Sequence, residues 1–185
     1  AGRWQEAQRV LEKGKNGGKV WPDPWHEEVQ KYETLLQVEL ERVRAYLAQG
    51  APRVAVVKLE HLRQLHPESI VVLKMLGKIL VQTGQWERAL NVFGQAQSKD
   101  PDDAELFQSI ASVYFGMGDV DRAMSQLGLA LAIDSTLASA HAGRGSILMQ
   151  RRQLPEAARA FQAAARFEPD DPSHLVQLGM ARCDL

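Results

Sequence analysis

The chain has 185 residues, of which 45% are hydrophobic and 24% charged, and its formal net charge is −1. This length suits one ordinary domain or a short array of repeats, and the balance of 22 basic against 23 acidic residues disfavours nucleic acid as a partner, because nucleic-acid binders normally carry a basic stripe. No apolar run approaches the roughly 20 residues needed to cross a bilayer, so we expect no direct membrane insertion.

The first predicted elements are the second helix of a partial repeat, over residues 1–12, and an inserted segment over residues 13–25. The insert begins with KGKNGGK, a composition typical of an exposed loop, and continues into the turn WPDPW. Its Trp21 and Trp25 either fix the loop onto neighbouring helices or form a secondary aromatic patch for a partner. Because the chain begins inside a predicted helix, we expect it to be a segment of a longer protein.

A long helix and a degenerate repeat are expected next, together covering residues 24–69. Asp23 is a suitable N-cap and Pro24 a suitable first helical residue, so the helix is predicted to run from Pro24 to about Ala48. Such a helix is roughly 37 Å long at 1.5 Å per residue. It is longer than the helices expected further along the chain, and we interpret the insert and this helix as a joint in an array.

The rest of the chain repeats with a period of 34 residues. An alanine recurs at this step and is followed four residues later by leucine or phenylalanine, at Ala55, Ala89, Ala123, Ala157 and at Leu59, Phe93, Leu127, Phe161. Within a period, apolar residues spaced i, i+3, i+4, i+7 form two stretches separated by a glycine such as Gly84, which can end a helix in the left-handed conformation. This period predicts stacked pairs of amphipathic helices. The predicted repeats are 70–103, 104–137 and 138–171, followed by the first helix of a further repeat at 172–185.

Small residues recur at a second position of the period, at Gly77, Ala111, Gly145 and Gly179. They predict a close crossing between the two helices of one repeat, where a large side chain does not fit. Polar residues suited to N-caps precede the predicted helices, at Glu68 or Ser69, Asp102 or Asp103, Ser135 or Thr136, and Asp171.

This pattern resembles the tetratricopeptide repeat, whose period is 34 residues and whose signature alternates large, small and aromatic positions before a closing proline. The resemblance covers 70–171 as three full units, and residues 36–69 resemble a weaker one in which Glu39 and Arg42 occupy apolar positions. It implies an all-α protein, a right-handed α-solenoid of tetratricopeptide helix-turn-helix repeats.

In that family, the first helices of successive repeats line a concave groove that binds a protein or peptide. The residues thereby implied in a peptide-binding groove are Lys74, Met75, Lys78, Gln108, Ser109, Ser112, Phe115, Ala142, Ser146 and Met149. The alternatives are a groove that is only solvated, or one that another part of the same protein fills. Chaperone-binding members hold a terminal carboxylate with a clamp of lysines, asparagines and an arginine, and here only Lys74 matches it. Binding of a chaperone tail is therefore not expected.

The sequence contains no nucleophile elbow, phosphate loop or haem-attachment motif, so no catalytic residue is predicted. The Asp102-Asp103 and Asp170-Asp171 pairs are interpreted as helix caps, and His141 as a packed, hydrogen-bonded residue. None of the five histidines has the spacing of a ligand pair, so neither a metal ion nor a cofactor is expected. Cys183 is the only cysteine, which excludes an internal disulfide and indicates no compartment.

Three functions remain open from the sequence. The first is a non-enzymatic scaffold for protein–protein interaction that binds a peptide or protein segment in its groove. The second is a regulatory or assembly arm of a larger multidomain enzyme or membrane-associated complex. The third is self-association into a homo-oligomer through the terminal helices, because a repeat array needs polar caps to cover its ends.

Overall fold

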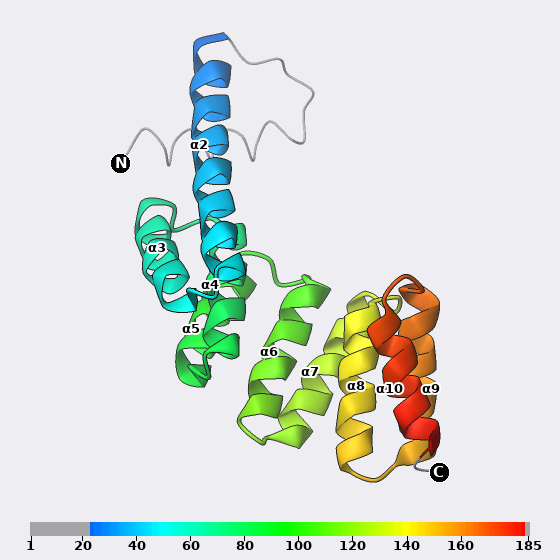
Figure 1. The fold of residues 1–185 in the computed structure, drawn as a ribbon. Coiled ribbons are helices and arrows are strands. Elements are labelled where there is room, and N and C mark those ends of the chain that lie inside the picture. The colour runs from blue at the N-terminus through cyan, green and yellow to red at the C-terminus, as the bar shows by residue number, and fades with distance from the viewer. Residues whose placement is uncertain (1–22, 184–185) are drawn as a thin grey trace. The chain divides into compact units, whose positions relative to one another are not determined.

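The computed structural model describes residues 23–183, with side chains from Thr34 onward (Figure 1). The chain divides into two units, residues 1–51 and residues 52–185. The helix expected at 1–12, most of the insert and the side chains of Trp21 and Trp25 lie outside the described residues. The described part contains helices and turns without strands, and none of its helices is long and apolar enough to span a bilayer.

The first unit contributes one described helix, α2 (Asp23–Ala48), where the sequence predicts a helix from Pro24. Leu40 and Val43 are its buried residues among the described side chains, and they lie one turn apart. Glu39 and Arg42, which occupy apolar positions of the degenerate repeat, form an ion pair with each other along the helix. Such an exposed ion pair stabilises a protein by about 1 kcal/mol or less. It therefore compensates little for the apolar contacts that large side chains would make at these two positions.

The second unit is a stack of helices in which each packs against the next along the chain. The first helices of three successive repeats also lie side by side, because α4 contacts α6 and α6 contacts α8 (Figure 1). This all-α helical-repeat solenoid confirms the predicted fold class. The helices are α3 (Pro52–Leu65), α4 (Ile70–Gln82), α5 (Trp86–Gln97), α6 (Ala104–Gly116), α7 (Val120–Ile133), α8 (Ala138–Gln150), α9 (Leu154–Phe167) and α10 (Pro172–Cys183).

Two of the recurring small residues, Gly77 and Gly145, lie where the two helices of a repeat cross. A Cβ added to Gly77 would lie 2.2 Å from the ring of Phe93 in α5, and one added to Gly145 would lie 2.7 Å from the ring of Phe161 in α9. Both rings are fully buried. The glycines therefore allow a close approach of the helices, as the sequence predicts.

Three of the expected N-caps are formed. The side chains of Ser69, Asp103 and Asp171 accept hydrogen bonds from the first turns of α4, α6 and α10. The expectation of Ser135 or Thr136 for α8 is wrong, because the N-cap is Leu137, which offers no side-chain acceptor. Thr136 instead donates both its backbone N–H and its hydroxyl to Asp134, so it belongs to the turn before the helix.

The first helices of the repeats end in a residue with positive φ. This residue is Gly84 (φ +71°) after α4 and Gly118 (φ +81°) after α6, as expected for left-handed helix ends. The equivalent residue after α8 is Arg152 (φ +59°), the only non-glycine with positive φ in the described part of the chain. A Cβ makes this conformation costly, so the third repeat carries local strain that the first two avoid.

Candidate protein-binding face

The ten predicted groove residues lie on α4, α6 and α8, the first helices that contact one another. We call their exposed and half-exposed side chains the first-helix face. Ser109 is an exception, because its side chain is 5% exposed and its hydroxyl donates to the carbonyl of Glu105 at 2.9 Å. Ser109 is therefore a packing residue of α6, and its inclusion in the binding set is not supported.

One end of the first-helix face is charged. The ammonium of Lys74 lies 2.7 Å from a carboxylate oxygen of Asp103 and 3.0 Å from one of Glu105. Burial opposes the charge of Lys74, but the hydrogen bonds to Asp103 and Glu105 prevail and raise its pKa. Lys78 is exposed and forms no ion pair with any described residue. Lys78 is thus the cation of this end that remains available to a partner.

The middle of the face is lined with small polar side chains whose hydrogen bonds are made within their own helices. Ser112 donates to the carbonyl of Gln108 at 3.2 Å and accepts from its side-chain amide at 3.1 Å. Ser146 donates to the carbonyl of Ala142 at 3.1 Å. Small, satisfied side chains allow a ligand backbone to approach without leaving a buried hydroxyl unpaired.

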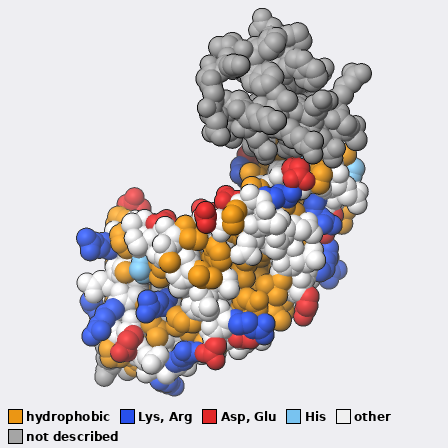
Figure 2. Space-filling view, turned by 180° about the vertical axis from the view of Figure 1, so that it is seen from behind, with side chains coloured by type: hydrophobic (Ala, Val, Ile, Leu, Met, Phe, Trp, Pro, Cys, Tyr) orange, Lys and Arg blue, Asp and Glu red, His pale blue; other side chains and the backbone are white. Residues whose placement is uncertain are grey.

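Apolar side chains are exposed further along the repeats. Phe115 at the end of α6 is 40% exposed, and Met149 of α8 is half-buried. On α10, Leu175, Val176 and Met180 are each 56% exposed. Figure 2 shows one side of the molecule, where hydrophobic side chains gather between scattered charged ones. Exposed aromatic and methionine side chains are typical anchors of protein interfaces.

Two histidines behave differently from one another. His141 is packed and hydrogen-bonded as expected, since it stacks on Phe167 at 5.5 Å and its Nε2 lies 3.0 Å from the carbonyl of Ser135. His174 instead meets two carboxylates, those of Glu168 and Asp171, at the turn between α9 and α10. Sequence reasoning missed this cluster because its three residues span a helix end and the start of the next helix. Their regular spacing of three was the available signal.

The tetratricopeptide repeat family matches residues 46–113 and residues 110–172, which together make up more than half of the chain. The chain belongs to the tetratricopeptide repeat family. Among solved structures, a thermophilic TPR protein of Thermus thermophilus has a TM-score of 0.70 at 22% identity, covering 76% of this chain and 78% of that one. MamA has a TM-score of 0.61 at 18% identity over 80% and 81% of the two chains. At these identities the likeness shows the fold alone.

Curated relatives contain a similar array within much longer chains. RNA polymerase II-associated protein 3 of Mus musculus is 27% identical over 104 residues, 56% of this chain and 16% of its own. DnaJ homolog subfamily C member 3 of Mus musculus is 30% identical over 52% of this chain and 19% of its own. Tetratricopeptide repeat protein 7A of Homo sapiens is 26% identical over 78% of this chain and 17% of its own. This chain therefore spans less than a fifth of the length of these relatives.

Proposed function

We propose that this chain is a non-enzymatic scaffold for protein–protein interaction that binds a peptide or protein segment along the first-helix face. Membership of the repeat family supports a role in protein interaction generally. A neighbouring structure, the first TPR of Spaghetti (RPAP3), is bound to the HSP90 peptide SRMEEVD, and it shares 24% identity and a TM-score of 0.55 over 61% of this chain. That ligand belongs to the neighbour, and here the partner is unidentified.

The main support for the proposal is that the first-helix face combines an exposed aromatic side chain, an exposed lysine and small polar side chains. Phe115 offers apolar surface, and Lys78 offers a charge that no described residue neutralises. The hydroxyls of Ser112 and Ser146 on the same face already donate within their helices, so a peptide that covers them leaves neither hydroxyl unpaired. An extended peptide or an amphipathic helix fits such a surface.

A chaperone tail is not the ligand we propose. Lys74 matches one clamp lysine of chaperone-binding members, but its charge is already neutralised by Asp103 and Glu105. Binding a carboxylate there would require breaking these contacts. By the family resemblance, Ser109 and Gly143 stand where chaperone-binding members have an asparagine and an arginine, and neither offers an amide or a charged side chain.

The test is partner capture by the double variant Phe115→Ala, Lys78→Glu, with the bound proteins identified by mass spectrometry. The control, Leu129→Ala with Lys58→Glu, changes an exposed leucine of α7 and an exposed lysine of α3. We expect a partner that wild type and control retain and the double variant loses, at unchanged helical circular dichroism. Equal capture by all three proteins would refute binding along the first-helix face.

Self-association through α10 is a second candidate, favoured by its exposed apolar side chains. Leu175, Val176 and Met180 leave one side of the helix apolar, and a Cβ added at Gly179 would meet no atom within 4 Å. Light scattering over a range of concentrations tests it. We expect the mass to rise with concentration in wild type and to stay monomeric in Val176→Lys, whereas a wild-type monomer throughout would refute it.

A further inference from the structure

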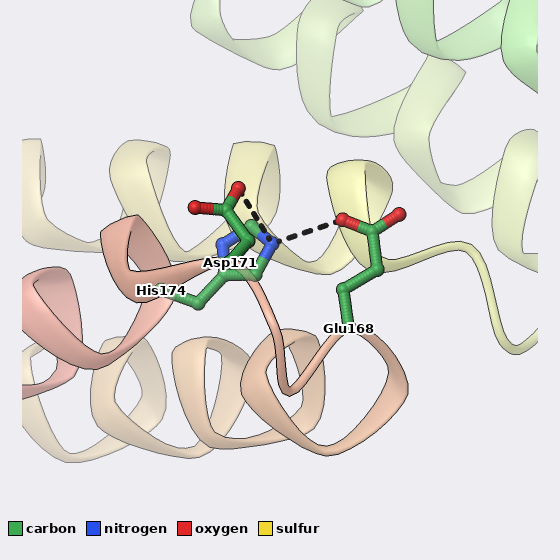
Figure 3. Close-up of side chains that lie close together, drawn as sticks. All are labelled: Glu168, Asp171 and His174. Carbon is green, nitrogen blue, oxygen red and sulfur yellow. Dashed lines mark hydrogen bonds and ion pairs between the residues drawn. The ribbon is translucent and has the colours of Figure 1, made fainter.

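Three electron-pair donors converge at the turn between α9 and α10 (Figure 3). The Nε2 atom of His174 lies 3.3 Å from Oε2 of Glu168 and 3.7 Å from Oδ2 of Asp171. All three atoms lie within 4.8 Å of one another. Glu168 follows the last residue of α9, whereas Asp171 precedes Pro172, the first residue of α10, so the cluster is fixed by two helix ends.

The imidazole is the buried member of this cluster. The side chain of His174 is 7% exposed, while those of Glu168 and Asp171 are 55% and 44% exposed. A neutral imidazole has one ring proton, and Nε2 faces two carboxylates. With the proton on Nδ1, three lone pairs face one another, and a cation between them removes the repulsion. With the proton on Nε2, this N–H donates to Glu168. In either tautomer Nδ1 is buried without a hydrogen-bond partner among the described residues.

The distances from Nε2 of His174 to the two carboxylate oxygens suit a small divalent ion. A tetrahedral zinc site with bonds of about 2.1 Å separates its ligand atoms by roughly 3.4 Å, close to the two distances from Nε2. A ligand set of one imidazole and two carboxylates favours zinc over calcium or magnesium, which prefer oxygen ligands alone. We propose that Glu168, Asp171 and His174 form a binding site for Zn²⁺ at the α9–α10 turn.

Neighbouring groups prepare the site for such an ion. The backbone N–H of Ser173 donates to Oδ1 of Asp171 at 2.9 Å, which orients the carboxylate with its other oxygen toward His174. An open hollow of about 500 Å³, lined by residues 167–172, adjoins the carboxylates and leaves room for water as the fourth ligand.

This site departs from the expectation of no metal ion. The expectation rests on ligand pairs along one helix, and His174 finds its partners across a turn. None of its three residues belongs to the first-helix face, so the proposed zinc site does not rest on the proposed binding function. An ion joining Glu168 to His174 would fasten the start of α10 to the end of α9.

The experiment is calorimetric titration of the whole chain with zinc chloride, repeated on Glu168→Gln and Asp171→Asn. Both variants remove a charge from a partly exposed side chain, and Asn keeps an acceptor for Ser173, so folding should be retained. We expect wild type to bind Zn²⁺ with a Kd on the order of micromolar, and each variant to bind at least about tenfold more weakly. Zinc should also raise the unfolding temperature of wild type and leave that of the two variants nearly unchanged.

The matched control is Asp170→Asn, which removes the same charge one residue away from a side chain outside the cluster. It should bind Zn²⁺ as wild type does. Cobalt titration adds an independent readout, because tetrahedral Co²⁺ has a visible absorption that Glu168→Gln should abolish. Two results would overturn the site: wild-type binding only at millimolar zinc, or equal affinity in wild type and both cluster variants. The cluster would then be a helix cap with an ion pair.

Discussion

Gly77 lies directly against the ring of Phe93, sixteen residues later in the second helix of the same repeat. A Cβ at Gly77 would approach three ring atoms at 2.2 to 2.7 Å, and the ring is fully buried. Gly145 and Phe161 repeat the relationship two repeats later. Gly179 occupies the same position of α10, but a Cβ there would meet nothing within 4 Å. The same position of the period thus has no room for a Cβ atom in two repeats and has room for one in α10.

Gly77→Ala and Gly179→Ala should therefore have opposite effects. The first forces the buried ring of Phe93 to move and should lower the free energy of unfolding by roughly 1–3 kcal/mol, the usual range for overpacking. The second adds helix propensity in open space and should raise it by up to about 1 kcal/mol. Urea denaturation followed by circular dichroism measures both. Equal changes in the free energy of unfolding for the two variants would mean that the ring of Phe93 is not the reason why glycine is required at position 77.

Arg152→Gly should stabilise the protein. Arg152 has φ +59°, where equivalent repeats have Gly84 and Gly118, and an L-residue pays roughly 1–2 kcal/mol for that conformation. Glycine removes this cost but loses more entropy on folding, so the net gain should be about 1 kcal/mol or less. The reciprocal change, Gly118→Arg, should be destabilising. A shift of the thermal unfolding midpoint in the same direction for both variants would contradict the explanation.

Lys74→Met should lower stability in a pH-dependent manner. Loss of the contacts to Asp103 and Glu105 should cost about 1–2 kcal/mol at neutral pH, because Lys74 is mostly shielded from solvent. The pKa of Lys74 is raised in the folded state, so its contribution is complete below the unfolded value of about 10.4 and is lost as pH rises through the folded value. The difference between wild type and variant should be constant from about pH 7 to 9 and shrink above about 10.5.

Lys78→Met is the control for this experiment, because Lys78 lies on the same helix without an ion pair to any described residue. Its effect should stay within about 0.5 kcal/mol at each pH. Urea denaturation across the pH series gives both differences. A Lys74→Met deficit that persists unchanged above about pH 11 would show that lost packing of the lysine stem, and not its charge, is responsible.

Ala123→Leu should overpack the crossing between α6, α7 and α8. Ala123 is fully buried in a cluster that includes Ala111, Leu127 and Ala140. The extra carbons should cost roughly 1–3 kcal/mol. Ala132→Leu, at an exposed position of the same helix, should be nearly neutral. If thermal unfolding shows similar stability for both variants, the recurring alanine is not a packing requirement.

The fold could be predicted from the sequence because similar residue types recur at the same positions of each repeat. The alanine at every 34th residue, the small residue at the helix crossing and the glycine that ends the first helix each indicate local geometry. Their recurrence at one period makes the pattern recognisable. For the first-helix face, the sequence predicted which helices contribute residues, but not which of those residues are exposed. The sequence placed Ser109 and Ser112 together on α6, but the structure buries Ser109 and leaves Ser112 half-exposed. Residues three apart on a helix differ in direction by about 60°, and that difference is enough to decide exposure.

The sequence by itself determined the all-α repeat architecture, because helix periodicity and helix-ending residues act over a few positions. Only the tertiary structure decided which charges remain available and which side chains meet. It neutralised Lys74 with Asp103 and Glu105, left Lys78 unpaired among the described residues, and brought His174 to Glu168 and Asp171. These outcomes depend on how one helix is oriented against the next, and that orientation is a property of packing across the repeats that no local spacing contains.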